Sequence, residues 1–168
     1  MKILETERLV LRHLLPEDLD SLYALYCDPE VRRYFPEGVL TYAETKEELE
    51  WFLHGHPTHP WLGLWATIHK TTHQFIGRCG LLPWTIDGRA EVEIAYLIDK
   101  AWWGQGLATE AAQAILRYGF ESLLYSRLVC MITPGNQASI RVAEKIGMRF
   151  EKAMEDDKGP FLLYTICK

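Results

Sequence analysis

Three features are scarce or missing in this sequence, and each absence excludes a class of protein. No run approaches 18 uncharged apolar residues, and the first 18 residues mix acids and bases, so we expect neither a membrane span nor a signal peptide. The four cysteines are widely spaced, which excludes compact zinc or redox motifs and favours reduced, mostly buried thiols in a cytoplasmic protein. Positive charge is not in excess: 18 Lys and Arg against 23 Asp and Glu give −5, so a nucleic-acid partner is not expected.

The 168 residues show neither an internal repeat nor a Pro/Gly/Ser linker, so we expect a single domain over residues 1–168. Hydrophobic periodicity predicts strands over 8–13, 62–69, 74–82, 90–98, 128–132, 150–153 and 161–166. It predicts helices after Pro16 and over 44–53, 106–120 and 138–146. The predicted fold class is α/β, a mixed α+β sheet with helices on both faces, in which 62–69, 74–82 and 90–98 are antiparallel neighbours.

The most informative stretch is EVEIAYLIDKAWWGQGLATEA, where a strand passes through a loop with Gly104 and Gly106 into a helix. The first-turn amides of a helix lack intrahelical partners, and the helix dipole adds positive potential, so such a junction accepts phosphate oxygens. Two glycines let the backbone approach them closely. The alternative is that both glycines serve only a tight turn.

Two nucleotide sites are excluded by residue type. A P-loop needs Gly-Lys-Ser/Thr, but Gly106 is followed by Leu107, Ala108 and Thr109, without a lysine. A dinucleotide fingerprint needs a third glycine where Thr109 stands.

The junction resembles the acetyl-CoA site of the GNAT superfamily of N-acetyltransferases, and the resemblance spans almost the whole chain. The family pattern [QR]-x-x-G-x-[GA] reads WGQGLA here, with Trp103 as the one departure. ETERLVLR, EIAYLI before WWGQGLATEA, and N-x-x-S before EKIGM are similar to the RimJ/RimL-like branch, which acetylates protein N-termini and other amines. The resemblance implies a GNAT-like acyl-CoA N-acyltransferase fold.

The resemblance also implies a set of residues that bind acetyl-CoA. Amides from Gly104 to Thr109 would hold the pyrophosphate, and the backbone around Tyr96 to Ile98 would pair with pantetheine as an added strand. The whole implied set is Tyr96, Leu97, Ile98, Trp103, Gly104, Gln105, Gly106, Leu107, Ala108, Thr109, Asn136 and Ser139.

Acyl transfer to an amine needs a neutral nucleophile and a route for a proton to the leaving thiolate. Glu91 and Glu93 share one strand face, and the family motif favours Glu93 as the base. The alternative is that both are solvated strand carboxylates.

Two further residues are implied to act at the reacting atoms. The resemblance places Ser139 near the CoA sulfur and gives Asn136 a polar contact to pantetheine or acceptor. The alternatives are that Asn136 is a helix cap and that Ser139 supports the first helical turn. The tyrosine acid that many relatives have seven residues after the asparagine is Ala143 here.

His54, His56 and His59 lie in HGHPTHP, but no nearby cysteine or acid completes a zinc site, so no metal is predicted and loop histidines are expected. Trp102 and Trp103 flank the glycine loop and are expected to anchor it. The other tryptophans of the first half are expected mainly to pack, with a contribution to the acceptor site as the alternative: Trp51, Trp61, Trp65 and Trp84.

The sequence therefore predicts an N-acetyltransferase that moves an acetyl group from acetyl-CoA to a primary amine by direct attack in a ternary complex. The acceptor is a protein N-terminal α-amine or a small-molecule amine, and no nucleic acid or membrane is involved. The alternative functions are an acyl-CoA-binding sensor, suggested by Ala143, and a purely structural protein. An unpaired edge strand or exposed apolar patch would permit a homodimer.

Overall fold

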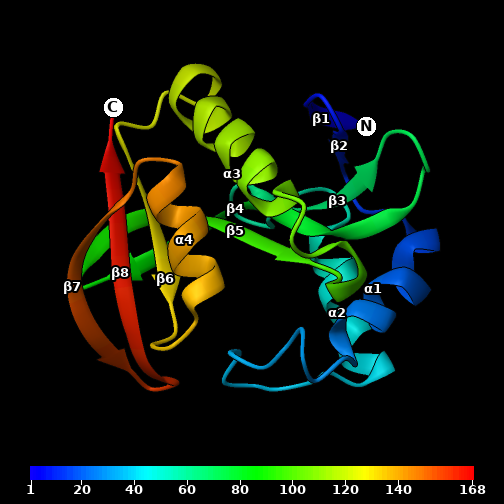
Figure 1. The fold of residues 1–168 in the computed structure, drawn as a ribbon, viewed down its shortest axis with the longest axis horizontal. Coiled ribbons are helices and arrows are strands. Elements are labelled where there is room, and N and C mark those ends of the chain that lie inside the picture. The colour runs from blue at the N-terminus through cyan, green and yellow to red at the C-terminus, as the bar shows by residue number, and fades with distance from the viewer.

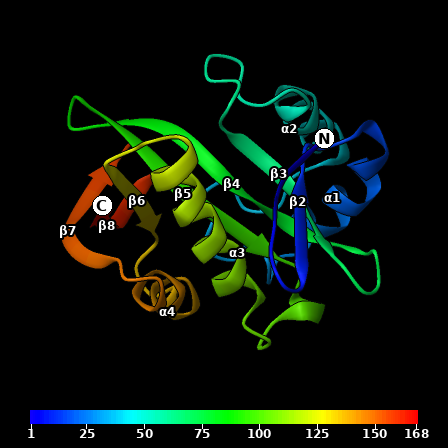
Figure 2. The same cartoon turned by 90° about the horizontal axis from the view of Figure 1, so that it is seen from above.

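The computed structural model describes residues 1–168 and places helices on both faces of one eight-stranded sheet (Figures 1 and 2). The strands are β1 (Lys2–Glu5), β2 (Leu9–Arg12), β3 (Gly63–His69), β4 (Phe75–Ile86), β5 (Arg89–Ile98), β6 (Arg127–Ile132), β7 (Arg149–Asp156) and β8 (Gly159–Cys167). The helices are α1 (Leu19–Tyr26), α2 (Tyr42–Phe52), α3 (Leu107–Arg117) and α4 (Gln137–Lys145). Short helical turns lie at η1 (Pro16–Asp18), η2 (Lys100–Trp102) and η3 (Tyr118–Ser122).

The strand order is β1-β2-β3-β4-β5-β6-β8-β7, and every neighbouring pair is antiparallel except β5 and β6. The antiparallel trio predicted in the middle of the chain is confirmed as β3, β4 and β5. Helix α3 connects β5 to the parallel strand β6, as parallel neighbours require a crossover. The alternation of strand direction is therefore interrupted at one place only, between β5 and β6.

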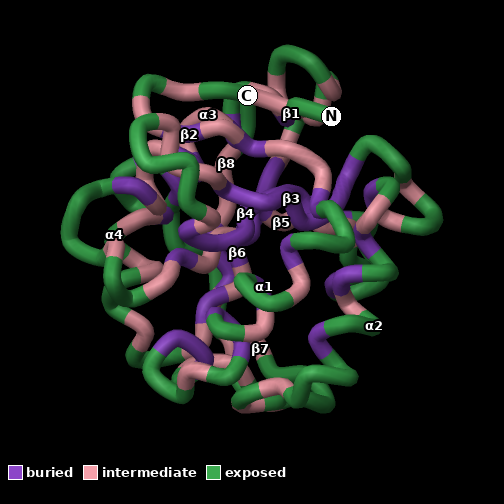
Figure 3. The backbone as a smooth tube through the Cα atoms, turned by 90° about the vertical axis from the view of Figure 1, so that its right-hand side faces the viewer, coloured by how far each residue is buried: buried purple, intermediate pink, exposed green.

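Two apolar layers hold the helices to the sheet, because strand side chains alternate between its faces. On β3, Trp65 packs in the cluster that includes α3 and α4, whereas Leu64 and Ala66 pack in the cluster of α1 and α2. Figure 3 shows buried backbone concentrated in the central strands. On β5, the same alternation puts Glu91 and Glu93 on the face of α1 and α2 and Tyr96 on the face of α3 and α4.

Local sequence explains where some elements begin. Thr41 caps α2, because its hydroxyl accepts from the Glu44 amide at 3.2 Å and the Glu44 carboxylate accepts from the Thr41 amide at 2.8 Å. At the β4–β5 hairpin, Asp87 and Gly88 both have positive φ, 51° and 72°, as a two-residue turn between twisted strands favours. Other helix starts and strand positions follow the predicted order.

The structure differs from the predicted elements in length. The four-residue strand β1 was not predicted, because Lys2–Glu5 is too short and too charged to show alternation. The segment PWTIDGR was expected as a connection, but β4 continues to Ile86 before the hairpin. Strand β7 is longer than predicted. Most of its residues are exposed and polar, so the sequence shows no hydrophobic alternation that would mark its full length. The α-helix expected to reach residue 120 ends at Arg117 and continues as the π turn η3.

No helix of the structure combines the length and the apolar character needed to cross a bilayer.

Candidate active site at the split between β5 and β6

Strands β5 and β6 separate soon after they meet. A single registered pair, Glu93 with Val129, joins them, whereas β4 pairs with all ten residues of β5. The second half of β5 therefore has no strand partner on its β6 side. Because the Asp99 amide donates to Ile76 of β4, alternation turns the amides of Tyr96 and Ile98 toward the split.

The glycine loop lies at the open end of this split. Gly104 and Gly106 both have φ of 76°, which only glycine adopts without strain, and nothing lies within 4 Å of a Cβ built at Gly104. Gly106 is the N-cap of α3, and no side chain caps this helix, so its first-turn amides at Leu107, Ala108 and Thr109 are open to a ligand. The loop fits the phosphate groups that the sequence predicts for it.

Two tryptophans anchor the loop, as predicted. The Trp103 indole donates to the Ile98 carbonyl at 2.7 Å, and the Trp102 ring lies on His69 with centroids 4.7 Å apart. The Trp103 bond occupies one of the β5 carbonyls at the split. Tyr96 and the Ile98 amide are then the β5 backbone groups left for an added strand.

The glycine loop is also supported by contacts from the N-terminal residues Thr6 and Arg8, which the sequence did not predict. The Glu110 carboxylate in α3 accepts from the Thr6 hydroxyl at 2.6 Å and from the Arg8 backbone amide and Nε at 2.8 and 2.7 Å. Arg8 Nη1 also donates to the Gln105 carbonyl at 3.0 Å. Burial opposes ionisation, but these hydrogen bonds prevail and lower the pKa of Glu110. The N-terminal TER motif, residues 6–8, thus holds the loop and compensates the negative charge of Glu110 near the start of α3.

Glu93 lies where the two strands part. Its Oε2 accepts from the Met131 amide of β6 at 3.3 Å, so the carboxylate reaches across the closed end of the split. Burial raises the pKa of Glu93 to about 7, against the smaller opposing effects of the Met131 amide, the Arg78 charge and the Trp84 indole. A carboxylate with this pKa takes up and releases protons near neutral pH.

Glu91, one pleat earlier, is differently placed. It is only 6% exposed, and both its oxygens accept from Arg127 Nε at 3.0 and 3.1 Å. Arg127 also donates to both carboxylate oxygens of Glu151 on β7, at 3.0 and 3.1 Å. The alternative that Glu91 is a solvated strand residue is wrong, because it is a buried partner in an ion-pair cluster joining β5, β6 and β7.

The N-terminus of α4 lies at the split on the face of the sheet opposite Glu93. Asn136 is its N-cap: its Oδ1 accepts from the Ser139 amide at 3.3 Å, and its Nδ2 donates to Ser139 Oγ at 3.2 Å. The Tyr96 hydroxyl donates to the Ser139 carbonyl at 2.8 Å. Since Ser139 Oγ accepts from Asn136, its own proton is available to another acceptor. Ala143 is fully buried in the core, so the position of the missing tyrosine is filled by packing.

The segment of residues 28–40, between α1 and α2, crosses the Glu93 face of the split. Asp28 pairs with Lys100 after β5 at 3.0 Å, the Tyr34 carbonyl accepts from Thr133 after β6 at 2.8 Å, and Glu37 pairs with Lys158 in the β7–β8 turn at 2.8 Å. The 28–40 segment therefore touches both arms of the sheet beyond the split.

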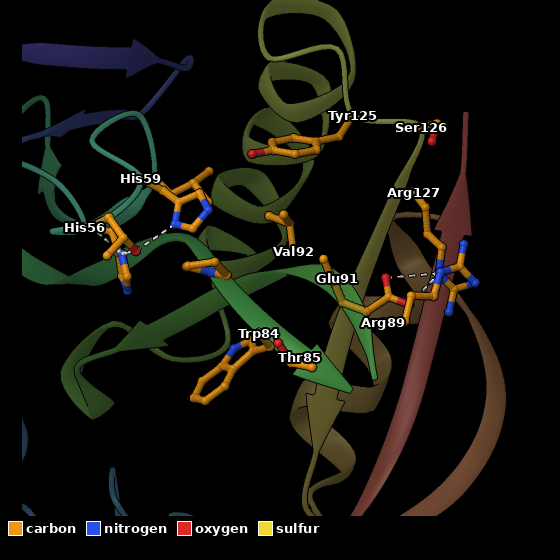
Figure 4. Close-up of a pocket in the computed structure, with 14 residues that line it drawn as sticks. His56, His59, Trp84, Thr85, Arg89, Glu91, Val92, Tyr125, Ser126 and Arg127 are labelled. Atoms are coloured by element: carbon orange, nitrogen blue, oxygen red, sulfur yellow. Dashed lines mark hydrogen bonds and ion pairs between the residues drawn. The ribbon is translucent and has the colours of Figure 1, made fainter. Parts of the chain in front are cut away.

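The histidine loop lines a different cavity of about 520 Å³, beside the β4–β5 hairpin and the start of β6 (Figure 4). His56 and His59 share the Thr58 hydroxyl at 3.1 and 2.9 Å, while His54 is exposed. The structure has no group of three potential metal ligands. Trp65 packs in the core, and Trp84 lines this cavity while also lying beside Glu93.

Comparison with known proteins shows which family this chain belongs to. The profile described as an acetyltransferase (GNAT) domain matches residues 8–149. The chain belongs to the GNAT acetyltransferase family. It is 36% identical to the uncharacterized protein YkkB of Bacillus subtilis, over 96% of this chain and 93% of that one. It is 32% identical to the uncharacterized N-acetyltransferase p20 of Bacillus licheniformis, over 93% and 87%.

Solved GNAT structures have the same architecture. An acetyltransferase of Bacillus anthracis, also described as GNAT family, superposes with a TM-score of 0.84 at 27% identity, over 99% of this chain and 98% of that one. RimL, described as a ribosomal L7/L12 α-N-protein acetyltransferase in complex with coenzyme A, superposes with a TM-score of 0.80 at 18% identity, over 99% and 98%. The likeness to RimL is one of fold. The chain is thus an N-acetyltransferase with the GNAT fold, as predicted.

Proposed function

We propose that this GNAT enzyme transfers an acetyl group from acetyl-CoA to a primary amine by direct attack in a ternary complex. The observation that carries the proposal is the split itself: an open β5 edge leads from an uncapped helix N-terminus to a carboxylate with a pKa of about 7. In this proposal Gly104 to Thr109 hold the pyrophosphate, and Tyr96 and Ile98 bind pantetheine.

The residues at the split account for both proton transfers. Glu93 takes a proton from the acceptor amine, directly or through water, as nitrogen bonds to the carbonyl carbon and the carbon–sulfur bond breaks. The thiolate receives a hydrogen bond from Ser139 Oγ, which Asn136 orients, and gains its proton from water, directly or through the Ser139 hydroxyl as water reprotonates it. Glu93 and Ser139 belong to opposite faces of the split, so amine and sulfur are served from different sides.

The acceptor in the proposal is an amine that is easily made neutral. An α-amine near pKa 7.8 is roughly a tenth neutral at pH 7, whereas a lysine amine near 10.4 is neutral in about four molecules per ten thousand. A base with a pKa of about 7 therefore suits an N-terminal or small-molecule α-amine. The RimJ/RimL-like motifs support the same assignment.

The test is calorimetric titration with acetyl-CoA, ATP and NAD, followed by thiol release with a panel of amines. We expect binding of acetyl-CoA only, lost in Gly106→Pro because proline cannot adopt the φ of 76° found there. Failure to bind acetyl-CoA would exclude the proposal. Binding without turnover on any amine would favour the sensor function, which the buried Ala143 suggests.

Location and assembly belong to the same proposal. All four cysteines are free, which fits the reducing cytoplasm, although Cys27 and Cys167 are exposed rather than buried as expected. A homodimer stays a prediction that sedimentation tests.

A further inference from the structure

Two arginines are buried on the Glu93 face without an acidic partner in contact. Arg78 on β4 is 5% exposed and Arg32 in the 28–40 segment is 4% exposed. Each makes one hydrogen bond within the protein, through Nε: Arg78 to the Tyr26 hydroxyl and Arg32 to the Gly38 carbonyl, both at 2.8 Å. Neither takes part in an ion pair, so the terminal nitrogens of both guanidinium groups are unpaired.

These terminal nitrogens keep some contact with solvent. The fully enclosed, unpartnered side-chain atoms of the protein are His13 Nδ1, Glu48 Oε2 and Thr67 Oγ1, and no arginine nitrogen is among them. The unpaired guanidinium nitrogens are therefore not completely enclosed, even though each side chain as a whole is buried.

Aromatic rings hold the two guanidinium groups side by side. Arg32 lies 4.0 Å from the Phe35 ring centroid and 5.1 Å from that of Tyr26, and Arg78 lies 5.6 and 5.5 Å from the same rings. Cation–π contact offsets part of the desolvation cost of each charge. It supplies no hydrogen-bond acceptor, so the fork-shaped terminal donors still lack an anion.

The nearby acids make no hydrogen bond to either guanidinium group. Glu48 acts on both arginines and Glu93 on Arg78 only through their charge, and Glu37, which acts on Arg32, is already paired with Lys158. Each guanidinium charge is thus desolvated without an anion bound to its terminal nitrogens. Such a charge is costly to bury unless a bound anion completes it.

The pair lies at the right place to bind the far end of an acceptor. Arg78 is opposite Leu97 on the sheet, and Glu93 is four residues before Leu97 on the same face, about 13 Å along the strand. Arg78 is also the one cation whose charge acts on the Glu93 carboxylate. A molecule with its amine at Glu93 extends along this face toward the arginines.

We propose that Arg32 and Arg78 bind a carboxylate of the acceptor, so that the preferred acceptor is an α-amine with a free carboxylate several bonds away, as in a dipeptide. This inference rests on the proposed function and names its substrate class. Two parallel N–H donors of a guanidinium match the two oxygens of a carboxylate, which is the geometry that favours Arg over Lys at such sites.

The test compares acids with their primary amides as acceptors: glycylglycine, alanylalanine and triglycine, each against its amide. Thiol release gives kcat/KM, corrected for the neutral fraction of each amine. We expect at least one acid to exceed its amide by tenfold or more, because the amide cannot satisfy the buried positive charge. Equal rates across all three pairs would overturn the inference and leave the proposed function standing.

Variants then locate the effect. Arg78→Gln and Arg32→Gln should each lower kcat/KM for the acid about 10- to 100-fold and for the amide less than about threefold. Arg33→Gln, an exposed neighbour of Arg32, is the matched control and should change neither. Equal losses on acid and amide, with acetyl-CoA binding retained, would show that the arginines are only structural.

Two outcomes keep this inference distinct from the proposed function. If a variant does not fold, the acid-to-amide ratio of the unaltered protein still decides the question. If acetyl-CoA binds but no acid or amide releases thiol, the proposed function fails and the acceptor inference fails with it.

Discussion

Two glutamates of β5, two residues apart on the same face of the sheet, have opposite surroundings. At the closed end, Glu91 accepts two hydrogen bonds from Arg127, which also holds Glu151, so its charge is fully compensated. Where the strands part, Glu93 receives one backbone amide and no ion pair, and burial raises its pKa to about 7. A hydrogen-bonded arginine thus distinguishes the ion-paired Glu91 from Glu93, whose carboxylate has no such partner.

Replacing each of the two glutamates by glutamine tests this contrast most directly. We expect Glu93→Gln to lower kcat about 100- to 1,000-fold, because the amide cannot accept the proton of the amine. Acetyl-CoA affinity, measured by calorimetry, should change less than about twofold. A Glu93→Gln enzyme with unaltered kcat would remove Glu93 from the proposed mechanism.

The pH dependence of kcat should follow Glu93. Its carboxylate is the active form, so with an acceptor that is neutral throughout, kcat should rise roughly tenfold between about pH 6 and pH 8. The raised pKa of Glu93 also makes the free energy of unfolding depend on pH. Between the unfolded pKa of 4.5 and the folded pKa of about 7, the folded protein binds more protons at Glu93 than the unfolded chain does, so this contribution to stability falls as pH rises. Chemical denaturation of wild type and Glu93→Gln measures the difference between their two slopes, which is the contribution of Glu93.

Ser139 is expected to have a smaller effect. Ser139→Ala removes the hydroxyl that Asn136 orients, and kcat should fall about fivefold because water can still protonate a thiolate. Ala138→Ser, at the exposed neighbouring position, is the control and should not alter kcat. A loss as large as that of Glu93→Gln would make Ser139 the principal acid.

Glu91→Gln should affect activity least. It leaves Arg127 with Glu151 but without its buried partner, so we expect about 1–3 kcal/mol lower stability and kcat within about threefold of wild type. Thermal unfolding and thiol release on the same preparation check both parts. Were kcat to fall a hundredfold with stability unchanged, the roles assigned to the two glutamates would have to be exchanged.

Much of the fold was predictable because its signals are local. The alternation of β3 to β5, the helical spacing of α3 and the glycines before it each lie within a short window. The site required contacts that no window contains: Thr6 and Arg8 meet Glu110 about a hundred residues later in the chain. Arg32 and Arg78 were invisible for another reason, since arginine is expected at the surface and only the folded chain buries it.

The three polar links of the 28–40 segment give the chain a modular character. The donor side of the split is built from β5, α3 and the N-terminal TER motif, whereas this segment provides Arg32, Phe35 and a cover tied to Lys100, Thr133 and Lys158. On the proposed assignment, a graft of another sequence between the ends of α1 and α2 would therefore replace Arg32 on the acceptor side, while Arg78 of β4 and the sequence of the coenzyme side stay as they are.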